Sequence, residues 1–369
     1  MKPPCLSWDT FDWAALDRLR DTFLAGERGG ATYWTSRSDL ENYDFTFAQR
    51  IAWKWDAVLR ELKLRGWSPP SETLLDWGCG SGIAGRRVIE WFGPECFKGL
   101  RVFDRSPLAT AFAVERARET FSTLRVEPVH EPPPLPALSP AGGGGEGVRR
   151  PGEGDFRKPS FPDRHGAEPG ASCVGTLVIS HVLNELNEAG GRALRHVIDR
   201  AEAVLWVEPG TYADSRALIA LRETLCETFH LIAPCTHQAR CGLRAPENER
   251  HWCHHFAAPP PNIMADSNWV RFAQRAGVDL RALPYSFLVL ERKGLRDPVP
   301  GQLPDGYSRI IGQPRFYKGF AKVFSCQADG VRDLTLQKRD APELFKALKR
   351  READAVHQWK LVVDRITDG

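Results

Sequence analysis

Three cysteines and four histidines lie close together in one irregular stretch, APCTHQARCGLRAPENERHWCHHF, residues 233–256. Cys235, Cys241 and Cys253 are followed, after a gap of 72 residues, by Cys326. Thiolate sulfur binds zinc and iron–sulfur clusters, so these residue types could hold a metal. No pair shows the Cys-x2-Cys spacing of most structural zinc sites, so the spacing by itself is only moderately informative.

The composition around these cysteines favours a metal site over simple packing. The stretch is rich in polar and turn-forming residues, and it lacks the periodic apolar face on which buried core cysteines normally lie. A metal would hold together a long loop that has no core of its own. Four thiolates suit zinc and an iron–sulfur cluster equally well, and the nearby histidines keep a mixed Cys/His zinc site open.

A second group with chemical potential is Asp76-Trp-Gly78-Cys-Gly80-Ser-Gly82, between a short apolar run and a helical pattern. Glycines let a ligand approach the backbone, and the following helix presents free N–H groups. We expect Asp76 to hold the cationic amino-acid end of a ligand. Asp104, which ends the next apolar run, is placed to accept from two ribose hydroxyls. The order of these residues resembles motif one of the class I methyltransferases, which implies S-adenosylmethionine as cofactor.

The same loop also fits a rival pattern. Gly80-Ser-Gly82-Ile-Ala-Gly85 matches the dinucleotide pattern G-x-G-x-x-G, which by itself is weak. A nicotinamide-dependent oxidoreductase coupled to a cluster therefore stays open, as does a tight turn that binds nothing.

The segment that would face a methyl acceptor is Ser180-His181-Val-Leu-Asn184-Glu185. Amino-group methyltransferases usually carry Asn/Asp-Pro-Pro-aromatic at this place, and this chain does not. We expect Ser180 to line the cofactor. His181, Asn184 and Glu185 are the candidates for catalysis, although the pattern favours a role for His181 in lining the cofactor or capping a helix over a role as base. The sequence does not establish that a methyl group is transferred.

Alternating strand and helix patterns between residues 73 and 210 predict a Rossmann-like α/β domain with a doubly wound parallel sheet. Periodic apolar and aromatic residues predict a helix over 44–67, and the C-terminal patterns predict a hairpin over 320–340 and a helix over 342–363. These patterns predict three regions. An N-terminal helical region covers 1–70, and the cofactor-binding domain covers 71–230 with a disordered Pro/Gly-rich insertion at 131–170. A metal-cluster loop with a basic β-rich extension covers 231–369.

Bulk properties narrow the function classes. The chain has 369 residues, 42% hydrophobic and 26% charged, which is typical of a globular protein. It has no apolar run of about 20 residues and no signal or transit segment, so we expect a cytoplasmic, membrane-free monomer with reduced cysteines. Residues 291–369 carry 16 Lys and Arg against 11 Asp and Glu, which is compatible with a phosphate backbone as partner.

Several sequence blocks together carry a more specific resemblance. In chain order they are Tyr33-Trp34, DLENY (39–43), LLDWGCGSG, SHVLNEL, EPGT, the cysteine stretch and RIIGQPRFYKG (309–319). Across roughly residues 30–350, this ordered set resembles the methyltransferase-like assembly proteins of the mitochondrial small ribosomal subunit and their bacterial relatives.

The resemblance implies a [4Fe–4S] cluster on Cys235, Cys241, Cys253 and Cys326, and binding to small-subunit rRNA rather than to DNA. Basic residues beside the last cysteine are expected to contact rRNA phosphates: Arg309, Arg315, Lys318 and Lys322. The missing transit segment and the insertion favour a bacterial, cytoplasmic member. A non-catalytic assembly factor with a degenerate methyltransferase fold is the main alternative to an enzyme.

Overall fold

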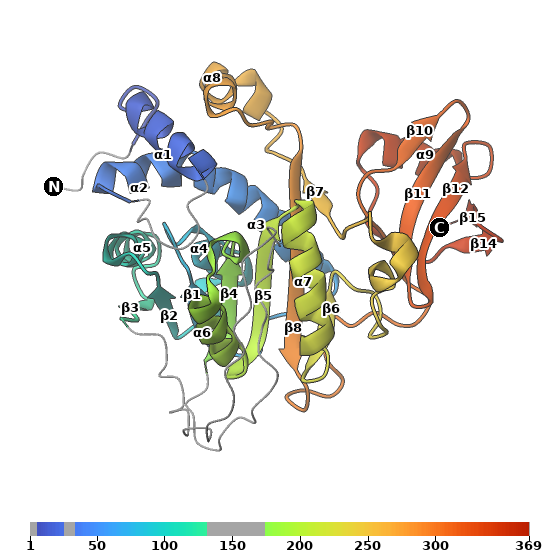
Figure 1. Ribbon diagram of the computed structural model, residues 1–369, viewed down its shortest axis with the longest axis horizontal. Coiled ribbons are helices and arrows are strands. Elements are labelled where there is room, and N and C mark those ends of the chain that lie inside the picture. The colour runs from blue at the N-terminus through green and yellow to red at the C-terminus, as the bar shows by residue number, and fades with distance from the viewer. Residues whose placement is uncertain (1–5, 26–33, 131–173, 369) are drawn as a thin grey trace, which may run out of the picture.

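The computed structural model describes residues 6–25, 34–130 and 174–368; the insertion predicted at 131–170 lies outside the described residues. Figure 1 shows two sheets beside each other, with the smaller one formed by the C-terminal part of the chain. Within the described ranges, no helix is both long and apolar enough to cross a membrane.

The larger sheet has the doubly wound arrangement that the sequence predicts. Its strands are β1 (Thr73–Trp77), β2 (Gly99–Phe103), β3 (Arg125–Pro128), β4 (Gly175–Ser180), β5 (Ala201–Pro209), β6 (Phe229–Ala233), β7 (His255–Ala257) and β8 (Leu283–Arg292). Their order is β3-β2-β1-β4-β5-β8-β6, with β7 paired to β8. Strands β1 to β5 pair in parallel, and the order reverses between β1 and β4. Such a reversal leaves a crevice at the carboxyl ends of the strands, where ligands bind in folds of this kind.

Strand β8 joins the larger sheet although the sequence assigned it to the C-terminal extension. It runs antiparallel to β5 and to β6 and lies between them. The run from Phe287 to Leu290 is buried on both faces, as a central strand requires. The boundary expected at residue 230 therefore does not separate the two sheets.

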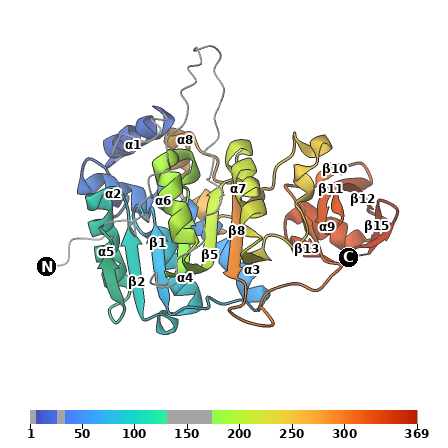
Figure 2. The same cartoon turned by 60° about the horizontal axis from the view of Figure 1, so that its bottom comes forward.

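Helices cover both faces of the larger sheet (Figure 2). They are α1 (Trp13–Ala25), α2 (Arg37–Phe45), α3 (Phe47–Leu64), α4 (Ile83–Phe92), α5 (Pro107–Thr120), α6 (Glu188–Ile198), α7 (Tyr212–Leu225) and α8 (Ser267–Ala276). Short 3-10 turns are η1 (Pro94–Cys96), η2 (Leu183–Glu185), η3 (Gly242–Arg244), η4 (Pro246–Asn248) and η5 (Ile263–Ala265). Helices α3, α4 and α5 share one apolar core with the sheet, and α6 and α7 share the other. The helix predicted over 44–67 is broken at Thr46, whose φ of −125° and ψ of −80° are not helical.

The smaller sheet follows the order β13-β9-β11-β12-β15-β14, with β10 paired to β11. Its elements are β9 (Ser308–Ile310), β10 (Arg315–Tyr317), β11 (Phe320–Gln327), β12 (Gly330–Gln337), α9 (Pro342–Arg350), β13 (Val356–His357), β14 (Lys360–Val362) and β15 (Arg365–Asp368). Strands β11 and β12 form the expected hairpin, and α9 packs Phe345 and Leu348 on its inner face.

The helix predicted over 342–363 is too long. It ends at Arg350, because Arg351 adopts a left-handed conformation with φ of 62°. The chain beyond it turns back as short strands and brings Leu361 and Ile366 to the apolar core of the smaller sheet. Burial against this sheet outweighs the local helical pattern.

Candidate functional site

The glycine loop after β1 forms the floor of a cavity. Gly78 has φ of 71°, and a Cβ there would lie 2.7 Å from Cγ1 of Val182, so only glycine fits. Gly80 also has a positive φ and faces open space. Gly82 is the N-cap residue of α4 and packs on Ala113 of α5, so it supports the loop and does not line the cavity.

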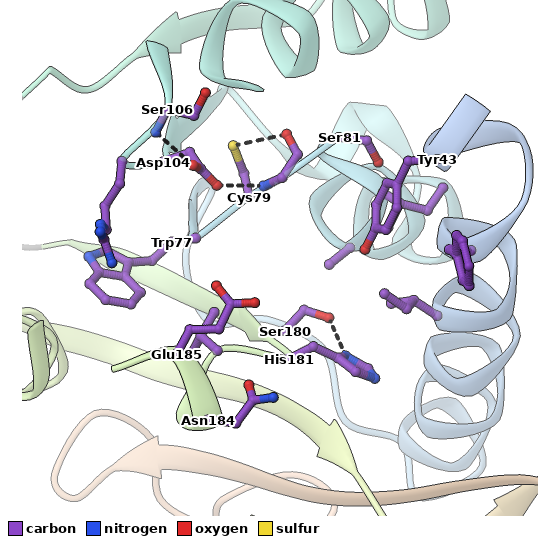
Figure 3. A pocket seen from close by; sticks show the side chains of 18 of the residues that line it. Tyr43, Trp77, Cys79, Ser81, Asp104, Ser106, Ser180, His181, Asn184 and Glu185 are labelled. Carbon is purple, nitrogen blue, oxygen red and sulfur yellow. Dashed lines mark hydrogen bonds between the residues drawn. The ribbon is translucent and has the colours of Figure 1, made fainter. Parts of the chain in front are cut away.

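The cavity has a volume of about 350 Å³, within the usual size of small-molecule sites. It opens at the carboxyl ends of β1, β2, β4 and β5, and helix α3 closes its other side (Figure 3). The structure brings together most of the candidates from the sequence, which line the cavity as follows: Gly78, Gly80, Asp104, Ser180, His181, Asn184 and Glu185. The aromatic walls come from Trp34, Tyr43, Phe47, Trp77 and Phe103.

Asp104 follows β2 and is joined to the glycine loop. Its Oδ2 accepts from Gly80 N at 2.9 Å, and its Oδ1 accepts from Ser106 N at 2.9 Å. Burial raises the pKa of Asp104, while these two backbone donors act in the opposite direction. Each carboxylate oxygen keeps a lone pair, so Asp104 can still accept hydrogen bonds from a ligand.

Asp76 does not lie where the sequence analysis expected it. Its side chain is buried beneath the loop, where Oδ2 accepts from Gly85 N at 2.9 Å, and it is not among the residues that line the cavity. Burial raises the pKa of Asp76 to about 7. The Asp76 carboxylate points from β1 toward α4 and stabilises the turn through Gly85 N.

Ser180 and His181 continue β4 into the cavity and belong to a polar chain that reaches α3. Ser180 Oγ accepts from Trp55 Nε1 at 3.0 Å and lies 3.1 Å from His181 Nδ1. His181 Nε2 lies 3.0 Å from Lys54 Nζ. His181 has φ of 57°, a strained conformation for a residue with a side chain, which is often found at functional sites.

The pKa shifts of His181 and Lys54 favour the uncharged forms of both side chains. Burial, with the positive charges of Lys54 and Arg50, lowers the pKa of His181 well below its usual range. Burial and Arg50 lower the pKa of Lys54 to about 7. The neutral tautomer that fits both contacts donates from Nδ1 to Ser180 and accepts at Nε2 from Lys54.

Asn184 and Glu185 lie in the η2 turn, which a buried carboxylate holds in place. Glu208 of β5 accepts at Oε1 from the backbone N–H groups of Val182 and Leu183, at 3.2 and 3.3 Å. Burial raises the pKa of Glu208 to about 8. Figure 3 shows the Glu185 side chain directed into the cavity, across from the glycine loop.

The sequence analysis missed Arg50 and Lys54, two cations one helical turn apart on α3 that line the cavity. Arg50 Nε is buried without a hydrogen-bond partner among the described residues, and burial lowers the pKa of Arg50. The cavity thus has Asp104 on the β2 side and two basic side chains, Arg50 and Lys54, on the α3 side. The sequence feature that could have revealed these two residues is a pair of charges at positions i and i+4 within an otherwise apolar face of the predicted helix.

The four cysteines gather at the junction of the two sheets. Cys241, Cys253 and Cys326 pack around one small apolar cluster, and negative charge on Cys235, Cys241 and Cys253 would raise the pKa of Cys326. Burial raises the pKa of Cys241 to about 11 and raises the pKa of Cys253 and of Cys326 further. Across the described residues, no group of three or more Cys, His, Asp or Glu side chains has the geometry to hold a metal ion.

Of the four basic residues expected to contact RNA, Arg309 does not fit that role. Its side chain is 3% exposed, binds Glu61 of α3 and lies over the ring of Phe287. It connects β9 to the larger sheet and is unavailable to phosphates. Arg315 is exposed and paired with Asp333, and Lys318 and Lys322 remain accessible to solvent.

Comparison with solved structures finds distant likenesses. Magnesium protoporphyrin IX methyltransferase from Synechocystis, solved with bound SAH, is 12% identical, with 77% of this chain and 97% of that chain covered and a TM-score of 0.36. TrmK from M. capricolum, in complex with SAH, is 9% identical, with 63% and 68% covered and a TM-score of 0.31. These TM-scores are too low to support the fold assignment, which rests on the strand order of the larger sheet.

No curated protein matches the sequence. The family described as mitochondrial small ribosomal subunit Rsm22 matches residues 167–356, just over half of the chain. The match spans β4 to β13, and so includes the cysteine stretch and most of the smaller sheet. The chain therefore belongs to the family of the mitochondrial small ribosomal subunit protein Rsm22, as its ordered sequence blocks predict.

Proposed function

We propose that this protein binds S-adenosylmethionine in the cavity at the carboxyl ends of β1, β2 and β4, and that it acts on the small ribosomal subunit through rRNA. The observation that carries the proposal is the distribution of charge around the cavity. Asp104, which follows β2 and accepts from Gly80 N, lies on one side, and Arg50 and Lys54 lie on the other. A ligand that combines a nucleoside with an amino acid matches this distribution, because its ribose hydroxyls can donate to Asp104 and its carboxylate can bind Arg50 and Lys54.

Within this proposal each group has a chemical task. Asp104 accepts from the ribose hydroxyls, and the aromatic walls contact the flat base. Arg50 and Lys54 attract the carboxylate of the methionine part, and that negative charge offsets the cost of their burial. The glycine loop leaves room for the ligand beside the backbone.

The acceptor would enter over the segment from Ser180 to Glu185. His181 would be the base that receives a proton from an acceptor, with Asn184 and Glu185 orienting that acceptor. Burial, Lys54 and Arg50 lower the pKa of His181 well below its usual range, so the ring is a weak base in this structure. Both ring nitrogens of His181 are already engaged, however, and Ser180 and Lys54 would have to release one of them. This observation favours the second candidate function, in which the protein is a non-catalytic assembly factor and the methyl donor is a structural ligand.

Cys235, Cys241, Cys253 and Cys326 would hold the [4Fe–4S] cluster that the family resemblance implies. Their residue type fits a cluster, because thiolates are its usual ligands. Cys241, Cys253 and Cys326 pack around one apolar cluster, and Cys235 is near enough to raise the pKa of Cys326. Burial raises the pKa of Cys241, Cys253 and Cys326, and the positive charge of Arg222 acts in the opposite direction, which favours bound thiolates. Such a cluster would supply a cross-link between the two sheets, or a site for electron transfer. Zinc is the alternative occupant.

Binding of the methyl donor tests the cavity assignment. We expect isothermal titration calorimetry to detect S-adenosylmethionine binding to the full chain, and Asp104→Asn to weaken it by about 10- to 150-fold, the value of a hydrogen bond to a charged group. Asp56→Asn is a matched control, because Asp56 pairs with Arg87 and does not line the cavity. Equal affinity in the Asp104 variant, or preferred binding of NADH, would overturn the assignment.

Subunit binding is tested separately by co-sedimentation with purified small ribosomal subunits. A variant that does not bind the methyl donor but still supports subunit assembly would favour the non-catalytic reading. Loss of assembly together with methyl-donor binding would favour an enzyme or a ligand-dependent factor. Failure of the wild-type chain to sediment with the subunit would refute the proposed partner.

A further inference from the structure

Among the described residues, no α-helix covers the face of the smaller sheet that lies opposite α9, and the short turn η3 packs on it at Gly330 and Val331. Along β11, Ala321, Val323 and Ser325 are fully buried on the side of α9, because successive side chains of a strand point to opposite faces. The alternate residues Phe320 and Lys322 are only partly buried. We call the side chains of β10, β11 and β12 that point away from α9 the outer face.

A pair of stacked aromatic rings marks one end of the outer face. Tyr317 of β10 lies opposite Phe320 of β11, with ring centroids 4.8 Å apart and planes within 10°. Tyr317 is 50% exposed, so the side of its ring that faces away from Phe320 meets solvent. Phe316 points the other way and packs on Phe345 of α9, which confirms the alternation of the two faces. A large exposed aromatic stack of this kind has no role in the core.

Positive charge surrounds this stack. Lys322 lies opposite Arg315, two cross-strand pairs from the Tyr317–Phe320 pair and on the same face, and Lys318 lies in the turn between β10 and β11. Within the described part of the chain, neither lysine forms an ion pair, whereas Arg315 neutralises Asp333, the acidic residue on this face of β12. The face therefore has free cations beside an exposed ring and no uncompensated acid next to them.

The outer face leads to the cysteines. Phe324 follows Lys322 on the same side of β11. Its ring contacts the ring of His251 from the cysteine loop, with centroids 4.6 Å apart. Cys326 is the next residue on that side. The cysteine loop therefore covers this end of the outer face, and the part around Tyr317 and Lys322 is the part left for a ligand.

We infer that the outer face binds an unpaired strand of RNA, with a base stacked on Tyr317 and phosphates on Lys318 and Lys322. Aromatic rings between cations are how proteins bind single strands, since every unstacked base offers a flat face. A duplex keeps its bases stacked on each other and cannot use the ring. This inference deepens the proposed function, on which it rests, by naming the surface and the kind of RNA.

Fluorescence anisotropy of the full chain with a labelled twelve-nucleotide oligo(U) RNA tests it. We expect Tyr317→Ala to weaken binding by about 5- to 150-fold, the value of one base stacked on an aromatic ring, and Tyr317→Phe to retain it. Lys322→Ala should lower the slope of log affinity against log salt concentration by about 0.7, as for one lost phosphate contact on a single strand.

Lys346→Ala is the matched control, because Lys346 is a 53% exposed lysine of the same C-terminal region on α9, away from the outer face. It should change affinity less than twofold. Equal binding by Tyr317→Ala and wild type, or equally tight binding of duplex RNA of the same length, would overturn the inference. The circular dichroism of each variant shows whether it is folded.

Sedimentation with small ribosomal subunits separates this inference from the proposed function. If the wild type binds oligo(U) through Tyr317 but does not sediment with the subunit, the face stands and the proposed partner fails. If the wild type sediments with the subunit and Tyr317→Ala behaves identically in both assays, the partner stands and the face is refuted. Equal binding of oligo(dT) would show that the face recognises unpaired strands without reading the 2′-hydroxyl, and would contradict a preference for RNA.

Discussion

Replacing Glu61 with glutamine should destabilise the connection between the two sheets. Glu61 lies on α3, and its carboxylate binds Arg309 of β9 through two hydrogen bonds of 2.6 and 2.8 Å. Arg65 of α3 binds the same carboxylate at 2.7 Å. The three side chains are only 16%, 3% and 4% exposed, in the order Glu61, Arg309, Arg65. Both guanidinium groups also donate to the backbone carbonyl of Pro234, which precedes the first cysteine.

The expected loss follows from this burial. Removing one partner of a buried ion pair usually costs about 3–5 kcal/mol, because the remaining charge is left without compensation. Glutamine has nearly the shape of glutamate, so Glu61→Gln leaves no cavity and isolates the charge effect. Two guanidinium groups would share one neutral amide, which places the expected loss in the upper part of that range.

The pH dependence gives a second readout. Burial raises the pKa of Glu61, but Arg309 and Arg65 outweigh it, and the net pKa lies below the unfolded value of 4.5. Stability from this pair is therefore present above pH 4.5 and is lost as pH falls through the folded pKa. The difference between wild type and Glu61→Gln should be constant from pH 5 to 8 and should narrow below about pH 4.

Urea unfolding followed by circular dichroism measures both effects. Asp17→Asn is the control, since Asp17 forms a similar two-bond pair with Arg275 at the surface, with side chains 39% and 38% exposed. That control should lose less than about 1 kcal/mol. A loss in Glu61→Gln no larger than in the control, or a difference that persists at low pH, would refute the reasoning.

Two further substitutions test the cavity and the cysteines. Burial lowers the pKa of Lys54 from 10.5 to about 7, so the free energy of unfolding of the wild type should rise as the pH increases from 7 to 10.5. At pH 6, where the buried Lys54 is charged, Lys54→Met should be more stable than the wild type by about 3–5 kcal/mol. Urea unfolding at pH 6, 8 and 9.5 checks this, and a pH-independent difference would contradict it. Cys326→Ser should reduce iron and sulfide from about four per chain to traces after anaerobic purification. Cys226→Ser, which lies outside the cysteine group, should retain them, and equal iron in both variants would exclude Cys326 as a ligand.

The family and the fold class were accessible from sequence because they depend on local patterns. Strand and helix periods alternate along 73–210, and this alternation predicts a parallel sheet. Gly78, Gly80 and Asp104 could be placed at one end of that sheet because the carboxyl ends of parallel strands lie together. The β11–β12 hairpin was equally local, since its turn and both strands are contiguous.

Tertiary structure decided which charged groups face the ligand and which are buried. Asp104 and Asp76 both follow or end apolar strands, yet only Asp104 reaches the cavity, because Asp76 turns toward the N–H of Gly85. Arg309 looked like a surface cation in sequence, but Glu61, 248 positions away, holds it inside. The contacts that make these choices join residues far apart in the chain, and periodicity carries no information about them.

The sequence by itself therefore determined the class of sheet, the glycine loop and the family. Only the folded chain revealed that Arg50 and Lys54 of α3 complete the cavity, that β8 belongs to the larger sheet, and that Tyr317 stacks on Phe320 at an open face. The physical reason is the same in each case. A local pattern reports whether a side chain prefers to be buried, whereas its partner depends on how distant segments pack together.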